Sequence, residues 1–148
     1  MRISAKGRYG LAAMINMAQN SKKDEPVTII SISEKLGISK IYLEQVFVFL
    51  KKANLLASTK GSSGGYRLKK PAEEITAYDI IFAIEQVLFE KTQESVSEKA
   101  DYIEKTMQSM VFEEIDRSIK KTLESITLSD LVTEAGKHSG NEDIMYYI

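Results

Sequence analysis

Apolar residues recur at intervals of three and four positions along the first part of the chain, which is the spacing of helices that bury one face. The first such stripe lies within residues 8–18. It consists of Leu11, Met14, Ile15 and Ala18. We therefore expect a first core helix over these residues.

Two further helices are predicted on either side of Gly37. Thr28 can accept hydrogen bonds from the first-turn amides of the earlier helix, and a glycine is well suited to ending it. Ser39 is placed as the N-cap of the later helix. The apolar stripe of that later helix consists of Leu43, Val46, Phe47 and Leu50. Helix, glycine turn and helix together form the helix-turn-helix pattern.

The outward face of this third helix carries two apolar residues, Ile41 and Val48, where a face that met only water would carry polar side chains. Two strand-like pieces follow at residues 55–59 and 66–68, joined by Lys60-Gly-Ser-Ser-Gly-Gly. Glycines permit positive φ and close approach to another surface, so these pieces predict a hairpin whose tip lies against a partner. A helix followed by a glycine-tipped hairpin with basic flanks is the layout of a recognition helix and wing. The sequence therefore predicts a mainly α fold with a small β wing, a winged helix-turn-helix.

The chain continues after the hairpin as helices with a polar interruption. Thr76 and Asp79 have the spacing of a capping box and begin a predicted helix that runs to about residue 88. The apolar side of this helix is expected to contain Ile80, Ile84, Val87 and Leu88. Residues 89–99 are polar and charged, and predict either a linker or a poorly packed helical extension. A second box, at Thr127 and Asp130, begins a short helix.

Residues 100–125 repeat apolar side chains at helical spacing. These side chains are Ile103, Met107, Met110, Val111, Ile115, Ile119 and Leu123. A helix of this length is too long to cover one small domain, so we expect it to pack against a copy of itself in a homodimer. The predicted organisation is a winged helix-turn-helix domain at 1–88, a linker, dimerisation helix and short following helix at 89–135, and a flexible C-terminal tail at 136–148.

Charge divides the chain into a basic half and an acidic half. Residues 1–70 hold 13 Lys and Arg against 4 Asp and Glu, whereas residues 71–148 hold 7 against 17. The basic excess coincides with the predicted recognition helix and wing, which favours contact with a polyanion such as DNA. The alternative is that two solvated surfaces of opposite sign merely attract each other.

Composition excludes several classes of chemistry. The chain contains no cysteine, which excludes disulfides, thiolate nucleophiles and cysteine-ligated zinc or iron–sulfur centres. No apolar run approaches the roughly 20 residues that span a membrane, and the first residues lack an apolar signal core, so we expect a cytoplasmic protein. Gly61-Ser-Ser-Gly-Gly lacks the lysine–serine pair of a phosphate-binding loop, and the single histidine, His138, has no neighbours for metal or acid–base chemistry. We therefore expect neither a cofactor nor an enzyme.

Four segments form a combination that is specific at its spacings. They are Met1-Arg-Ile-Ser-Ala-Lys-Gly-Arg-Tyr-Gly, Gly37-Ile-Ser-Lys-Ile-Tyr-Leu-Glu-Gln, Gly61-Ser-Ser-Gly-Gly-Tyr-Arg-Leu and Ile75-Thr-Ala-Tyr-Asp-Ile. Over about residues 1–88 the chain resembles the Rrf2 family of bacterial winged-helix transcription regulators. Some members sense iron–sulfur clusters or nitric oxide through three cysteines, and the corresponding residues 88–101 contain none here. The resemblance is therefore to the cysteine-free CymR type, which represses cysteine-metabolism genes. Gln86 in place of a glycine and Lys60 in place of an arginine depart from the family pattern.

The C-terminal end carries a second resemblance. Met145-Tyr-Tyr-Ile148 is similar to the Met-Phe-Tyr-Ile terminus of the CymR type, whose isoleucine resembles the tail that serine acetyltransferase inserts into cysteine synthase. A free carboxylate on an apolar side chain mimics an amino-acid substrate. The resemblance implies that Tyr146, Tyr147 and Ile148 contact cysteine synthase. The alternative is that these residues dock on their own dimer.

The family positions also imply which residues contact DNA. Glu44 and Gln45 would read bases, because glutamine pairs with adenine and glutamate accepts from the cytosine amino group; alternatively they are ordinary solvated residues. Tyr42 either donates to a phosphate or packs beside the wing. The implied DNA-binding set is Lys6, Arg8, Ser39, Lys40, Ile41, Tyr42, Glu44, Gln45, Lys51, Lys60, Gly61 and Arg67. Its basic members, together with Lys52, would contact phosphates, with Lys60 and Gly61 at the minor groove, although any one lysine can be a bystander.

We expect a homodimeric repressor of cysteine or sulfur metabolism genes. Its operator should be pseudo-palindromic, because a two-fold symmetric protein binds a DNA site with matching two-fold symmetry. Two alternatives stay open. One is a winged-helix module that binds a protein and never touches DNA. The other is a regulator of different genes that responds to a small molecule.

Overall fold

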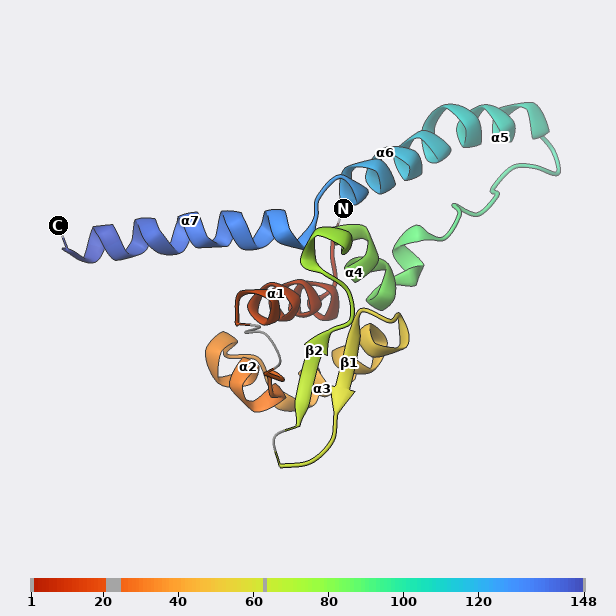
Figure 1. The fold of residues 1–148 in the computed structure, drawn as a ribbon. Helices are drawn as coiled ribbons and strands as arrows, with labels where there is room; N and C mark the ends of the chain where they lie inside the picture. The colour runs from red at the N-terminus through yellow and green to blue at the C-terminus, as the bar shows by residue number, and fades with distance from the viewer. Residues whose placement is uncertain (1, 21–24, 63, 148) are drawn as a thin grey trace.

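Three helices form the body of the protein: α1 (Ala5–Asn20), α2 (Ile29–Leu36) and α3 (Lys40–Lys52) (Figure 1). The computed structural model describes residues 2–20, 25–62 and 64–147, and only the backbone of 141–147. At the start of α2, Thr28 accepts a hydrogen bond from the backbone N–H of Ser31. Gly37 ends this helix with φ 67°, in the left-handed region that glycine tolerates. The predicted helix-turn-helix is thus confirmed.

The core lies between these helices and α4 (Ala77–Ile84). The predicted stripe of α3 is fully buried: Leu43, Val46, Phe47 and Leu50. Helices α1 and α4 pack closely at Gly10, where an added Cβ would lie 2.1 Å from Cδ1 of Ile84. A side chain at position 10 would therefore force the end of the Ile84 side chain to move.

The wing consists of β1 (Leu56–Thr59) and β2 (Gly65–Leu68), paired antiparallel with Leu56 opposite Leu68. Val27, just before α2, adds a bridge that sequence periodicity does not predict. Its N–H donates to the carbonyl oxygen of Tyr66 at 2.7 Å, and the Tyr66 N–H donates back at 2.8 Å. The Tyr66 ring also meets Phe47 edge-on, with ring centroids 4.8 Å apart. Tyr66 therefore fixes the wing to the body through both backbone and side chain.

Helix α4 follows the short turn η1 (Ala72–Glu74) and begins with the predicted capping box. Asp79 N–H donates to Thr76 Oγ1, and Thr76 N–H donates to Asp79 Oδ2. The helix ends earlier than expected, because the backbone leaves helical geometry at Glu85 and continues as the 3-10 turn η2 (Gln86–Phe89). The prediction that Val87 lies on the buried side is therefore wrong, and its side chain is 76% exposed.

A long helical rod extends away from the body (Figure 1). It consists of α5 (Asp101–Met107), the π-helical turn η3 (Gln108–Phe112) and α6 (Glu113–Glu124), in agreement with the helix expected over 100–125. Residues 90–100 lack a regular helix and form the linker. Glu104, only 2% exposed, accepts hydrogen bonds from the linker N–H groups of Ser95 at 2.9 Å and Val96 at 2.8 Å.

The last helix, α7 (Leu128–Tyr147), begins at the predicted second box, in which Thr127 and Asp130 exchange hydrogen bonds. The expected flexible tail from residue 136 is instead a continuation of this helix. Two features favour the helix over an irregular chain. Its start is capped, and Glu134 pairs with Lys137 and His138 one turn further along. No helix in the described ranges is long and apolar enough to cross a membrane.

Candidate nucleic-acid interface

The outer face of α3 is open to solvent. Ile41 and Val48 are 68% and 64% exposed, and Glu44 and Gln45 are exposed between them. Lys40 Nζ lies 3.8 Å from Glu44 Oε1. Because both side chains are exposed, this ion pair contributes little to stability, and either side chain can form other contacts instead. The face thus presents a carboxylate and an amide flanked by apolar side chains.

The start of α3 suits an anion. Ser39 occupies the predicted N-cap position, but its side chain makes no capping hydrogen bond, so only half of that expectation holds. The first turn also contains no acidic residue, and Lys40 is its first member. The first-turn N–H groups and the positive end of the helix dipole therefore attract negative charge such as a phosphate.

The tip of the wing carries Lys60 and Gly61, both exposed. Gly61 has φ 108°, and an added Cβ on Gly64 would lie 2.4 Å from the carbonyl oxygen of Thr59. The tip thus needs glycine at both positions. Arg67 differs from the other predicted phosphate contacts, because it is half-buried on β2 opposite Ala57.

The N-terminal basic residues lie beside the corner where α4 ends. Lys6 and Arg8 are exposed on α1, and Arg8 Nη1 donates to the carbonyl oxygen of Ile3 at 2.7 Å. The N–H of Ser4 donates to Glu85 Oε1. Arg8 therefore shapes the segment before α1, a role that the sequence pattern does not indicate, and Glu85 ties that segment to the end of α4.

Tyr42 packs against the first helix. Its ring meets that of Tyr9 edge-on, with centroids 5.8 Å apart, and it is 48% exposed. The two predicted roles, donation to a phosphate and packing beside the wing, stay predictions. Tyr9 follows Arg8 in the sequence, but no local pattern links it to Tyr42, which lies 33 positions later.

The predicted dimerisation side chains differ in how far they are exposed. Ile103, Met110, Val111 and Ile115 are between 42% and 73% exposed, and Met107 and Leu123 are half-buried. Ile119 instead lines a small pocket with Tyr78 and Phe89, beside its own α4. In the same place Lys120 Nζ lies 5.5 Å from the centre of the Tyr78 ring, which attaches α6 to α4.

The predicted partner-binding end is only partly described. Tyr146 and Tyr147 lie in the last turn of α7, but their side chains are outside the described part of the chain, as is Ile148 altogether. Within the described ranges no three His, Cys, Asp or Glu side chains are grouped so that they could hold a metal ion.

Comparison with known proteins identifies relatives over most of the chain. Residues 3–134 match the Rrf2 family model, described as an iron-dependent transcriptional regulator. The regulator IscR of Photorhabdus laumondii is 36% identical over 132 residues, which are 89% of this chain and 79% of that protein.

Solved structures agree with this match. IscR of T. potens has a TM-score of 0.69 and 36% identity, over 91% of this chain and 88% of that one. CymR of B. subtilis, described as the global cysteine regulator, has a TM-score of 0.70 and 33% identity, over 90% of this chain and 98% of that one.

Proposed function

This chain belongs to the Rrf2 family of DNA-binding transcriptional regulators, and we propose that it acts as a homodimeric repressor of a pseudo-palindromic operator. Each α3 would enter a major groove, and each wing would lie in the neighbouring minor groove. The observation that carries this proposal is the open face of α3, continued by the basic tip of the wing.

Base recognition would come from Glu44 and Gln45, which are exposed on α3 and free of packing constraints. Phosphates would be contacted by the exposed basic residues Lys6, Arg8, Lys40, Lys51 and Lys60, and by the hydroxyl of Ser39 at the helix start. Ile41 would meet the apolar edge of a base such as the thymine methyl group. The half-buried Arg67 and the packed Tyr42 would contribute at the edge of this surface.

The dimer would form along the rod α5–η3–α6. Large apolar side chains on a surface helix that extends from the body are costly to leave in water, which supports their burial in a second copy. In this arrangement residues 1–88 form the DNA-binding unit, 89–135 the dimerisation unit, and 136–148 the end of α7.

A thiolate-bound iron–sulfur cluster does not fit the residues of this chain, although the family description names iron. The sequence has no thiolate donor, and the carboxylate of Glu104 is used to bind backbone N–H groups of the linker. DNA binding would therefore be controlled by something other than a thiolate-bound iron–sulfur cluster.

Genes of cysteine or sulfur metabolism are the regulon that we propose, supported by the similarity to CymR of B. subtilis. Binding of the C-terminal residues to cysteine synthase would provide the control. Deletion of residues 145–148 should then abolish binding to cysteine synthase in a pull-down. Unchanged binding, or no binding by the intact chain, would reject this partner.

The DNA-binding proposal is tested by fluorescence anisotropy with duplex DNA at several salt concentrations. A protein that neutralises several phosphates loses affinity steeply as salt rises, with a log–log slope of about −0.9 for each phosphate. We expect such a slope with any duplex and a tighter complex with the operator. A flat salt dependence would favour a winged-helix module that binds a protein instead.

A further inference from the structure

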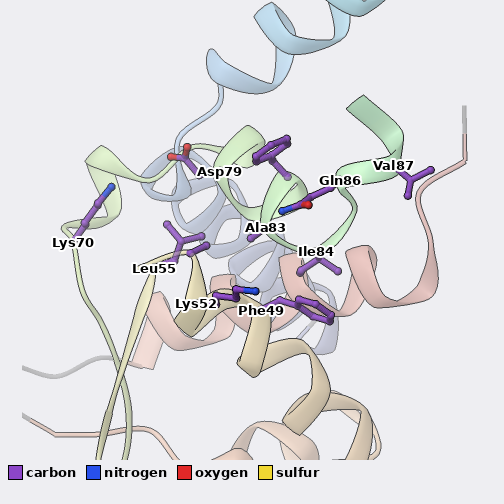
Figure 2. A pocket seen from close by; sticks show the side chains of 11 residues that line it. Phe49, Lys52, Leu55, Lys70, Asp79, Ala83, Ile84, Gln86 and Val87 are labelled. Carbon is purple, nitrogen blue, oxygen red and sulfur yellow. The ribbon is translucent and has the colours of Figure 1, made fainter. Parts of the chain in front are cut away.

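A pocket of about 610 Å³ opens between the end of α3 and the corner where α4 passes into η2 (Figure 2). Its volume lies within the roughly 300–1,000 Å³ of typical small-molecule sites. Phe49, one turn after Gln45 on α3, forms one wall, and Ala83 and Ile84 of α4 form another. The pocket therefore connects the helix proposed to read DNA with the segment that leads to the rod.

The charged groups of the pocket are mainly basic. Lys52 and Lys70 line it, and neither has an ion-pair partner in the part of the chain that the structure describes. The neighbouring Lys69, by contrast, donates to Asn54 Oδ1 at 3.0 Å. Asp79 is the one acidic residue of the lining, and its Oδ2 already accepts the N–H of Thr76 in the capping box. Two lysines against one aspartate leave the lining with an excess of positive charge, which favours an anion.

Large apolar side chains at the same place remain in water. Phe49 is 40% exposed and Phe82 39%, and the neighbouring Val87 is 76% exposed. Figure 2 shows Lys52 and Gln86 reaching in from opposite sides of the pocket, with Ala83 between them in this view. Apolar walls with a few polar end groups are the usual composition of a ligand site.

We propose that this pocket binds a small organic anion with an apolar or aromatic body, of which a carboxylate is the simplest example. Lys52 and Lys70 would both attract the acid group, the Gln86 amide would donate to it, and the body would cover Phe49 and Phe82. The consequence for regulation rests on the proposed DNA-binding function. A negative charge at the end of α3 repels the phosphate backbone and occupies Lys52, so the ligand weakens DNA binding.

The site is tested by NMR titration of the full, ¹⁵N-labelled chain with three probes that share a phenyl ring and a four-carbon chain and differ in their polar end group. The probes are 4-phenylbutyrate, the uncharged 4-phenyl-1-butanol and the cationic 4-phenylbutylamine. We expect the carboxylate to shift the amide signals of residues 49–55 and 82–87, the alcohol to bind several-fold more weakly, and the amine to bind most weakly. Equal affinities for carboxylate and alcohol would overturn the anion specificity. Shifts elsewhere in the chain, or none, would overturn the location.

The lysines are tested by Lys52→Gln, Lys70→Gln and the double variant. Each substitution should lower carboxylate affinity about two- to fivefold, the range of a partly exposed ion pair, and leave alcohol affinity unchanged. Lys99→Gln, an exposed lysine of the linker, is the matched control. Circular dichroism confirms that the variants fold. Carboxylate affinity of the double variant equal to that of the parent chain would reject the assignment.

Anisotropy with duplex DNA separates the ligand site from the proposed function. Without probe, Lys70→Gln should bind DNA as the parent chain does; saturating 4-phenylbutyrate should weaken DNA binding by the parent chain and less so by Lys70→Gln. A carboxylate that binds the pocket without changing DNA affinity would reject the regulatory role. Absence of DNA binding without probe would reject the proposed function, and the titration alone would then decide the site.

Discussion

At the wing tip, two backbone carbonyl oxygens leave no room for a side chain at position 64. An added Cβ on Gly64 would lie 2.4 Å from the carbonyl oxygen of Thr59 and 2.9 Å from that of Gly61. Both neighbours are backbone atoms, which cannot rotate aside as the end of a flexible side chain can. The tip must therefore change shape if position 64 gains a side chain.

Gly64→Ala should accordingly destabilise the protein by about 1–3 kcal/mol, the usual cost of a side chain forced into occupied space. DNA affinity should fall as well, because the displaced tip carries Lys60. Chemical denaturation and anisotropy measure the two effects. Ser62→Ala, on the exposed tip, is the control and should change neither. Parent-like stability of Gly64→Ala would contradict the close approach.

The two proposed base readers and the proposed phosphate contact should behave differently when replaced. Alanine at Glu44 or Gln45 should reduce the discrimination between the operator and single-base variants by about 1–3 kcal/mol at one position of the site. Lys60→Ala should weaken binding to all duplexes alike and reduce the salt slope by about 1. Anisotropy with a panel of operator variants distinguishes the two effects. The same change in sequence preference for all three variants would reject the separate roles.

Among the elements, the linker depends on one buried carboxylate. Hydrogen bonds from the backbone of Val96, the side chain of Gln108 and the backbone of Ser95 hold the pKa of Glu104 below its ordinary value of 4.5. A carboxyl whose pKa is lowered on folding stabilises the fold above its unfolded pKa, and this stabilisation is lost as pH falls through the folded pKa.

Glu104→Gln should therefore lower the midpoint of thermal unfolding at neutral pH, and its difference from the parent chain should shrink as the pH falls below about 4.5. The linker amides of Ser95 and Val96 should exchange faster with solvent in the variant, which hydrogen exchange by NMR measures. Glu98→Gln, an exposed carboxyl in the same linker, is the control. If the difference in unfolding midpoint between Glu104→Gln and the parent chain stayed constant from pH 7 to pH 3.5, the charge of the Glu104 carboxylate would not contribute to stability.

Elements with local sequence signals were predictable, and elements held by distant contacts were not. The cap at Thr28, the turn at Gly37 and both capping boxes depend on residues three or four positions apart, so the sequence reveals them. The bridge from Val27 to Tyr66 joins residues almost 40 positions apart, and no periodicity indicates it. The early end of α4 likewise follows from the backbone geometry at Glu85, where no glycine or proline in the sequence indicates the end of a helix.

The candidate site shows the same division. The open face of α3 follows from the spacing of its buried stripe, so the exposure of Glu44 and Gln45 could be foreseen. The contact of Tyr42 with Tyr9 and the bond from Arg8 to the Ile3 carbonyl depend on how α1 packs, which no single sequence pattern determines. The pocket beside Phe49 likewise exists only once α3 and α4 are placed together.

In the whole molecule, an acidic rod extends from a basic body, and the rod carries the apolar surface that we propose for the dimer. Met110, Val111 and Ile115 are 73%, 47% and 50% exposed. A two-fold operator would require two DNA-reading helices at a fixed spacing, which the proposed rod dimer would provide. A substitution that abolishes dimerisation should therefore also abolish tight binding to the operator.

Ile115→Lys should convert the protein to a monomer, because a charge in an apolar interface has no partner there. The variant should lose most of its affinity for the two-half-site operator but keep the weak affinity of one body for a half-site, since α3 and the wing lie outside the substituted helix. Sedimentation velocity measures the mass, and anisotropy measures both affinities. Ser109→Lys adds the same charge on the rod outside the apolar set and should remain a dimer. A monomeric parent chain, or a dimeric Ile115→Lys with full operator affinity, would place the interface elsewhere.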